Sequence, residues 1–454
     1  MSAAVMDKTA ASRLLEKTVS EALKRGALGA ECAWSSSHAR SFRVRDDELE
    51  RSSIAERVSI GLRVLDGKSR QGVASLSEFD GDTAAELCDA AFENARHNAP
   101  EDDVIFASKP PEMPQDDLAL YDEEIPRWEP EEQIALCLDM SREARRLDKR
   151  IRCVPTAGVS TGWSDSLCLN HYGIRCESRA TYGSLGLTLL GEDGDASEIN
   201  GAGCSARSAA KLRSSLPVAE AVNNTVRLFH GRTLPSGRYR LVLEPSVTVA
   251  FLGELAELFS AVSVYKGLSL LKGKMGQSVA SDKLTLIDDG RIPAGMGSSA
   301  FDSEMVATRR TVLLDRGELS SWLCNLQYGR RLGFESTGNG CRGLSSLPDV
   351  DVNNFYVLPG SRSRDEIIAA NDGCFCVAEL MGLHTIDTVT GDFSLGARGH
   401  YYKNGVFSPV SSVTVAGKLT DLLKNITEVG ADLRFFDRFG GCTMVVDDIA
   451  VAGT

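Results

Sequence analysis

The residues from which a metal centre could most easily be built are the six histidines, His38, His97, His171, His230, His384 and His400. Zinc peptidases of the HExxH or HExxxH kind place two histidines and a glutamate on one helix, which hold zinc and activate its bound water. No two histidines of this chain lie within ten residues of each other. The sequence therefore contains neither pattern.

Two looser sets of cysteine and histidine remain as possible metal ligands. Cys168, His171 and Cys176 lie within nine residues and would need a fourth ligand. We favour the alternative, a β-hairpin that turns near residues 170–173 and carries these thiols incidentally, because structural zinc sites normally show paired short spacings. The second set consists of Cys374, Cys376, His384 and His400. Strand alternation places its two cysteines on one face, which suits packing or ligation, and we favour packing in a core.

A glycine-rich segment at residues 338–343, GNGCRG, formally matches the dinucleotide pattern GxGxxG. Such a site needs a preceding strand, a following helix and an acidic residue about twenty positions on. Residues 344–348, LSSLP, are not helix-forming, so we interpret the segment as a loop near a backbone crossing. No GxSxG or GxxxxGK[ST] pattern occurs, and the serine pair 298–299 has no identifiable base, which favours a structural turn.

Composition narrows the class of protein. The 454 residues, 43% hydrophobic and 25% charged, can fill two or three globular cores. A net charge of -13 argues against nucleic-acid binding, which draws on a basic surface. The start MSAAVMDKTAAS is unlike a signal peptide, and no apolar run approaches the ~20 residues of a membrane helix. We expect a cytoplasmic protein with no membrane partner, whose twelve cysteines, none in a CxxC pair, are reduced.

The first 233 residues predict an N-terminal domain of helices and hairpins. One apolar stripe and a following glycine predict a helix over 8–25. Alternation over 56–76, with a turn at Asp66-Gly67, predicts a hairpin. The remaining expected elements are helices over 83–95, 130–147 and 205–229, the last with Pro217 as a kink or break, and strands within 151–191.

The main boundary is placed at the turn LPSG, residues 234–237, which gives domains 1–233 and 234–454. An acidic, proline-rich stretch, 98–130, is interpreted as a linker that wraps the surface. The second domain is rich in glycine and short β-like segments, with helices expected over 247–262 and 417–429. Because helices and strands do not alternate regularly, the fold class is α+β and not a doubly wound parallel sheet.

Three segments of the second half resemble the TldE/PmbA subgroup of the TldD/PmbA (modulator of DNA gyrase) metalloprotease family. The first spans residues 288–340 and contains GMGSSAFDSEMVATRR and, at its end, STGNG. The second is ELMG at 379–382 with TVTGDFSLGARGHYYKNG at 388–405. The third is PVSSVTVAGKLTDLLKNITEVGADL at 409–433, with DDIAVAG at 447–453. The resemblance covers most of 236–454, and the first half matches it only in general layout.

The resemblance implies a two-domain TldD/PmbA-like α+β subunit, with an N-terminal helix/hairpin domain and a glycine-rich, β-dominated C-terminal domain. It also implies a dimeric, cytoplasmic complex that degrades or processes unfolded peptides. TldD-like chains of the family carry HExxxH and zinc, whereas TldE-like chains do not. By this resemblance the chain has no cofactor or catalytic residue of its own, and zinc is expected in a TldD-like partner, unless the chain pairs with a second copy of itself.

The family's zinc helix follows the first strand of the C-terminal domain. By resemblance, Gly253 and Leu258 stand at the two histidine positions and Glu254 stands at the position of the catalytic glutamate. These are degenerate zinc-motif positions, because glycine and leucine cannot bind zinc. Without a metal-bound water, the glutamate cannot generate hydroxide by this route.

A peptide groove would be built from exposed strand edges with glycine-rich flanks, to which a peptide adds as a strand. The groove candidates are Thr390, Gly391, Asp392 and Ser394. For Asp392 the alternative is a turn in which its carboxylate accepts nearby backbone N–H groups. Two other functions stay open for the chain as a whole: a free-standing peptide-binding or scaffold protein, and an enzyme with a different metal or thiol centre.

Overall fold

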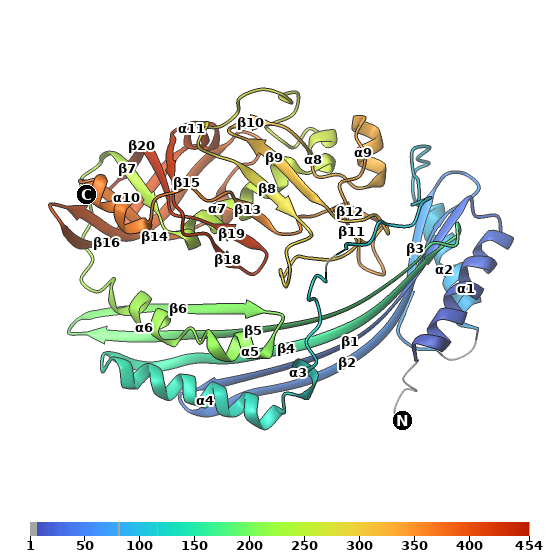
Figure 1. The fold of residues 1–454 in the computed structure, drawn as a ribbon, viewed down its shortest axis with the longest axis horizontal. Helices are drawn as coiled ribbons and strands as arrows, with labels where there is room; N and C mark the ends of the chain where they lie inside the picture. The colour runs from blue at the N-terminus through green and yellow to red at the C-terminus, as the bar shows by residue number, and fades with distance from the viewer. Residues whose placement is uncertain (1–6, 80–81, 116, 454) are drawn as a thin grey trace.

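The structure of the protein, a computed structural model, describes residues 7–79, 82–115 and 117–453. A long antiparallel sheet, here called the curved sheet, forms the N-terminal part in the order β3-β2-β1-β4-β5-β6. Its strands are β1 (Gly29–Arg45), β2 (Glu48–Leu65), β3 (Gln71–Leu76), β4 (Ile151–Asn170), β5 (Arg175–Asp193) and β6 (Ala196–Ala206). The C-terminal part lies over the concave side of this sheet, and α4 (Pro130–Leu147) lies beneath its convex side (Figure 1).

Alternation along the long strands gives the curved sheet two different faces. On β1, Trp34 packs in the core with helices α1 (Lys8–Lys24) and α2 (Thr83–Arg96), while Phe42 and Val44 pack against α4. Since successive side chains point to opposite faces, the residues between them, such as Ser35, face the C-terminal part. The apolar face is thus covered by helices, and the polar face is left for contact with the second domain.

The helices begin where local sequence signals place them. The Asp7 carboxylate accepts the Ala10 N–H at the start of α1 at 2.7 Å, and Asp82 caps α2 in the same way. Pro130 occupies the first turn of α4, where its missing N–H costs no hydrogen bond. The helices predicted over 8–25, 83–95 and 130–147 are confirmed.

The C-terminal part holds two six-stranded sheets. The first has the order β16-β15-β14-β7-β20-β17, and an additional pairing of β16 with β20 closes five of its strands into a ring. Its strands are β7 (Gly237–Leu243), β14 (Cys374–Met381), β15 (Asp392–Lys403), β16 (Val406–Lys418), β17 (Ile426–Val429) and β20 (Met444–Ala452). The second sheet has the order β10-β9-β8-β13-β19-β18. It consists of β8 (Leu286–Asp289), β9 (Arg310–Asp315), β10 (Glu318–Leu319), β13 (Phe355–Val357), β18 (Arg434–Phe436) and β19 (Phe439–Gly441).

One large core joins these two sheets and includes α7 (Pro245–Ala256) and the 3-10 turn η1 (Glu257–Phe259). The remaining elements are α3 (Glu124–Arg127), α5 (Ala209–Ser214), α6 (Val218–Val226), α8 (Ala261–Lys266), α9 (Leu326–Leu332), α10 (Arg364–Ala370), α11 (Leu419–Lys424), the turn η2 (Leu383–Thr385) and the two-stranded pair β11 (Gly340–Cys341) and β12 (Asp349–Val350). Most strands pair antiparallel, and helices and strands do not alternate regularly, so the predicted α+β class is confirmed.

Several predicted elements were wrong in extent. The strand β1 was not predicted, and β2 begins before residue 56. The helix predicted over 205–229 begins only at α5, after the end of β6, and the break predicted at Pro217 is confirmed, since Pro217 lies between α5 and α6. The helix predicted over 247–262 is divided into α7, η1 and α8. The helix predicted over 417–429 ends at Lys424, because Ile426 and Val429 pair with β20 as a strand.

The proline-rich segment 98–130 does more than wrap the surface. Its Val104, Phe106 and Ala107 are buried, and the ring of Phe106 lies 4.7 Å from the Arg63 guanidinium of β2. Asp103 binds Arg331 of α9 in an ion pair. The segment therefore helps to connect the curved sheet to the C-terminal part.

Candidate functional site

A cavity of about 330 Å³ lies between the concave face of the curved sheet and loops of the C-terminal part. Its lining comes from segments far apart in the sequence: Ala33, Trp34, Ser35, Ser166, Cys168, Ser178, Ser299, Phe301, Asp302, Ser303, residues 338–344, Asp351, Val352, Asn353 and Arg438. We call it the interdomain cavity. The glycine-rich motif segments within 288–343 supply much of its wall.

The floor of the interdomain cavity is a row of serines on neighbouring strands. Ser35 of β1 pairs with Ser166 of β4, which in turn pairs with Ser178 of β5. The Oγ atoms of Ser166 and Ser178 are 2.6 Å apart. Each hydroxyl can donate one hydrogen bond and accept others, so this floor can bind polar groups of either kind.

The opposite wall contains Asp302, whose carboxylate organises two loops. It accepts the backbone N–H groups of Glu304 and Val306, each at 2.9 Å, and that of Gly340 at 2.8 Å. Burial raises the pKa of Asp302 to about 8, and the neighbouring Glu304 carboxylate acts in the same direction. A Cβ at Gly340 would lie 2.8 Å from the Asp302 carboxylate, so this close approach requires glycine.

Two amide side chains of the lining are held from behind by Asp288. Its carboxylate accepts the Asn339 Nδ2–H at 2.8 Å and both the backbone and the side-chain N–H of Asn353, at 2.7 and 3.0 Å. Burial raises the pKa of Asp288 to about 7, although these hydrogen bonds oppose the shift. The orientation of the lining thus depends on a buried acid that does not itself face the cavity.

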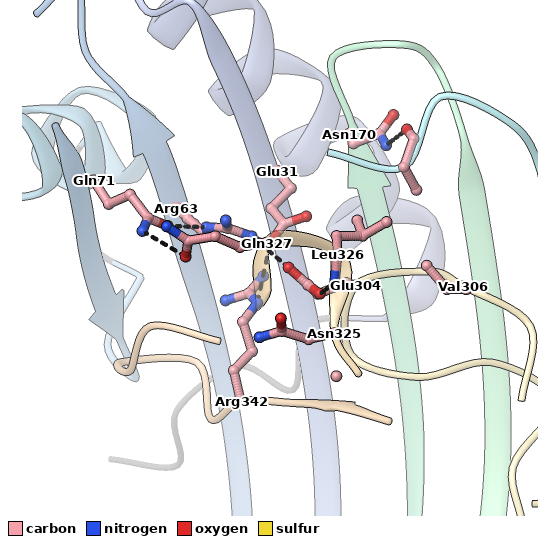
Figure 2. A network of polar contacts seen from close by, with 12 residues as sticks. Glu31, Arg63, Gln71, Asn170, Glu304, Val306, Asn325, Leu326, Gln327 and Arg342 are labelled. Carbon is pink, nitrogen blue, oxygen red and sulfur yellow. Dashed lines mark hydrogen bonds and ion pairs between the residues drawn. The ribbon is translucent and has the colours of Figure 1, made fainter. Parts of the chain in front are cut away.

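Beside the cavity, a buried ionic cluster joins the two domains (Figure 2). Arg63 of β2 is fully buried and donates through Nη1 to Glu31 at 3.0 Å and to Glu304 at 3.3 Å. Its Nε donates to Gln71 at 3.0 Å. Arg342, which lines the cavity, lies 3.1 Å from the same Glu31 oxygen. Glu31 and Arg63 come from the curved sheet and the other two charges from C-terminal loops, so the cluster fixes the domains against each other.

The degenerate zinc-motif positions lie elsewhere. Gly253 and Glu254 are in α7, where Gly253 is exposed and no atom lies within 4 Å of a Cβ placed on it. Leu258 lies beyond the end of α7 in η1, and its side chain is 1% exposed in the large core. The two positions that would carry histidines therefore do not share a helix or an environment. None of the three lines the interdomain cavity.

The groove candidates lie at the start of β15. Thr390, Asp392 and Ser394 are exposed and Gly391 is buried. β15 pairs with β16 from Asp392 onward, but β14 pairs with β15 only from Gly396 onward. Over residues 392–395 one side of β15 therefore has no strand partner among the described residues, and the groove assignment stays a prediction. The Asp392 carboxylate pairs with Lys418 at 2.9 Å, which lowers the pKa of Asp392. The turn-forming role considered for it belongs to Asp387, which accepts the N–H groups of residues 389 and 390.

The cysteine and histidine sets are dispersed among packing interactions. Cys168 and Cys176 face each other in the β4–β5 hairpin, whose predicted turn near 170–173 is confirmed. Cys374 and Cys376 lie on one face of β14, as strand alternation predicts, with 3.8 Å between their sulfur atoms. Within residues 7–79, 82–115 and 117–453, no three His, Cys, Asp or Glu side chains are grouped as a metal site would require.

The glycine-rich segment 338–343 forms β11 and part of the cavity wall. It is followed by β12 and no helix, since the next helix of the chain is α10. The predicted loop at a backbone crossing is therefore what the structure has, and Gly338 lies against the backbone of Ala307. Sequence reasoning did not find the cavity itself; the glycine spacing marked its wall, but the serine floor gives no local signal.

None of the described helices combines the length and the apolar character that crossing a membrane would require.

Comparison with known proteins identifies the family. Residues 30–95, 123–229 and 236–453 match, in order, domain 1, the central domain and the C-terminal domain of the PmbA/TldA metallopeptidases. The metalloprotease PmbA of Escherichia coli O157:H7 is 26% identical over 452 residues, which cover 97% of this chain and 96% of PmbA. A metalloprotease of Methanothermobacter thermautotrophicus is 32% identical over 61% of this chain and 62% of its own length.

Solved structures show the same fold. A candidate modulator of DNA gyrase from Bacteroides thetaiotaomicron superposes with a TM-score of 0.89 at 23% identity, covering 99% of this chain and all of that one. TldE from Thermococcus kodakarensis superposes with a TM-score of 0.87 at 21% identity, covering 97% of this chain and all of that one. With all three consecutive family domains present and this fold shared along the whole chain, the protein belongs to the PmbA/TldD metallopeptidase family.

Proposed function

We propose that the chain is the TldE/PmbA-like, zinc-free subunit of a cytoplasmic metalloprotease complex that degrades or processes unfolded peptides. Its partner in this proposal is a TldD-like chain that carries HExxxH and the zinc ion. The observation that carries the proposal is the content of α7 and η1, where glycine and a buried leucine stand at the two histidine positions.

Chemistry gives the same expectation. A metallopeptidase needs zinc to lower the pKa of a bound water and to polarise the scissile carbonyl. Glu254 could act as a base only toward such a water, and no histidine lies between His230 and His384 to help hold a metal beside it. The family membership suggests the reaction class, and the missing histidines support a catalytic step carried by another chain.

The test is metal content and peptide cleavage, measured on the purified chain alone and after co-expression with an HExxxH-bearing relative from the same genome. We expect zinc and cleavage only in the mixture, with the two chains eluting together. The matched control is the same mixture in which both histidines of the partner motif are replaced by alanine; it should assemble without cleaving. Stoichiometric zinc with cleavage by this chain alone would contradict the proposal and direct attention to its thiols.

A further inference from the structure

The concave face of the curved sheet carries serines in register across several strands. One row is Ser59, Ser35, Ser166 and Ser178, on β2, β1, β4 and β5. A second row is Ser53, Ser41, Ser160, Ser184 and Ser205, on β2, β1, β4, β5 and β6. Neighbouring strands lie about 4.8 Å apart, so each row presents hydroxyls at that repeat across the sheet. Three members of the first row form the floor of the interdomain cavity.

A second feature of the same cavity points to a ligand. The Arg342 side chain is 4% exposed, and its Nη1 has no hydrogen-bond partner among the described residues. Buried guanidinium N–H groups are nearly always paired, because leaving one unpaired costs its full desolvation. Arg342 also lines the cavity, so an oxygen atom of a bound molecule could accept from it.

We propose that the interdomain cavity binds the main chain of an extended peptide, with its amide groups on the serine row and a main-chain oxygen accepting from Arg342. This inference rests on the proposed function and gives the zinc-free subunit a direct part in holding the substrate. Hydroxyls serve both the N–H and the C=O of a peptide, since they donate and accept. Small side chains on the floor offer no deep pockets, so binding should depend little on the peptide's side chains.

The acidic side chains of the lining do not oppose this assignment. The Asp302 carboxyl already accepts three backbone N–H groups. Asp351 is paired with Arg438 at 2.9 Å. The oxygen that Arg342 binds can be an internal carbonyl or the carboxylate at the end of the peptide, and the two sources differ in charge.

Binding is measured by fluorescence anisotropy on the full chain, with a labelled, unstructured alanine–glycine decapeptide made as a C-terminal acid and as an amide. The variant Ser166→Leu fills the floor and should weaken both peptides about tenfold or more, the equivalent of losing one or two hydrogen bonds. The matched control is Ser164→Leu, on the same strand and face but outside the cavity lining. Circular dichroism and the midpoint of thermal unfolding establish that both variants fold.

Cys341 supplies a second readout, because it is an exposed thiol in the cavity wall. Saturating peptide should slow its alkylation by iodoacetamide severalfold, while Cys153, at the far end of β4, should react at an unchanged rate. An acid bound at least about tenfold more tightly than the amide would assign Arg342 to a terminal carboxylate. Equal affinities, with protection of Cys341, would assign it to an internal carbonyl.

The inference is overturned if Ser166→Leu and Ser164→Leu bind peptide equally, or if the bound peptide leaves Cys341 unprotected. Either result would leave zinc content and cleavage of the co-expressed complex as they were, so failure here is distinguishable from failure of the proposed subunit role.

Discussion

Replacing Arg63 with methionine tests whether the buried ionic cluster holds the two domains together. The side chain is fully buried and contacts Glu31 and Glu304, whose carboxylates are themselves 1% and 0% exposed. Methionine has a similar length but no charge, so both carboxylates would stay buried with their main counter-charge removed. Removing one partner of a buried ion pair typically costs about 3–5 kcal/mol.

Other contacts reduce this cost to the lower end of the range. Glu304 still accepts the Leu326 N–H at 2.8 Å, and Glu31 keeps the guanidinium of Arg342 at 3.1 Å. We therefore expect a loss of about 3 kcal/mol, which lowers the midpoint of thermal unfolding by about 6–12 °C for domains of this size. The midpoint is followed by circular dichroism and by tryptophan fluorescence.

The loss of stability in Arg63→Met should also depend on pH. Burial raises the pKa of Glu304, and loss of the arginine raises it further. Lowering the pH therefore protonates this carboxyl and reduces the loss of folding stability in the variant. The variant should consequently lose more stability at pH 8 than at pH 5. The control is Arg152→Met, whose pair with Glu192 is largely exposed and should contribute less than about 1 kcal/mol. The reasoning would be refuted if both variants lost equally little, or if the loss were the same at both pH values.

Three further predictions concern the cavity wall and α7. Because burial raises the pKa of Asp302 to about 8, folding takes up a proton, and the free energy of unfolding should fall as pH rises from about 4 to 8. The urea midpoint should change less across that range in Asp302→Asn than in the natural chain. Parallel plots of midpoint against pH for the two proteins would contradict the assignment. Gly340→Ala should cost about 1–3 kcal/mol through overpacking against that carboxyl, whereas Gly343→Ala, with its nearest neighbour at 3.5 Å, should be nearly neutral in the same thermal assay. Leu258→Ala should cost about 2–5 kcal/mol, whereas Gly253→Ala should be tolerated. A double variant with histidine at both positions should have a lower thermal midpoint and bind no stoichiometric zinc by metal analysis. A stable double variant loaded with zinc would contradict this prediction.

Local sequence signals were enough to predict the three helices whose ends are marked by capping or first-turn residues. The stripe over 8–25, the capping residue Asp82 and the first-turn proline Pro130 act through contacts within a few residues, and each helix lies where these signals put it. The same local reasoning was wrong for 417–429, where pairing with a distant strand overrides helix propensity. It also missed β1, which is stabilised by two partners remote in sequence.

The site shows the same division between local and distant information. The glycine spacing at 338–343 could be recognised in the sequence, and so could its failure to start a helix. The assignment of Asp392 to a groove needs a strand edge without a partner, and whether one exists depends on strand pairing: β16 pairs with β15 from Asp392 onward, and β14 only from Gly396 onward. That pairing involves residues far along the chain, so no window of sequence contains it.

The sequence by itself determined that neither HExxH nor HExxxH is present, because these motifs need two histidines a fixed, short distance apart. It also determined the family resemblance, since the motif glycines and acids occur in order. Only the tertiary structure decided that Leu258 is buried, that Arg63 and Arg342 share Glu31, and that serines on separate strands form one floor. Burial, desolvation and strand register are properties of residues brought together from distant parts of the chain, and they become defined when the domains pack.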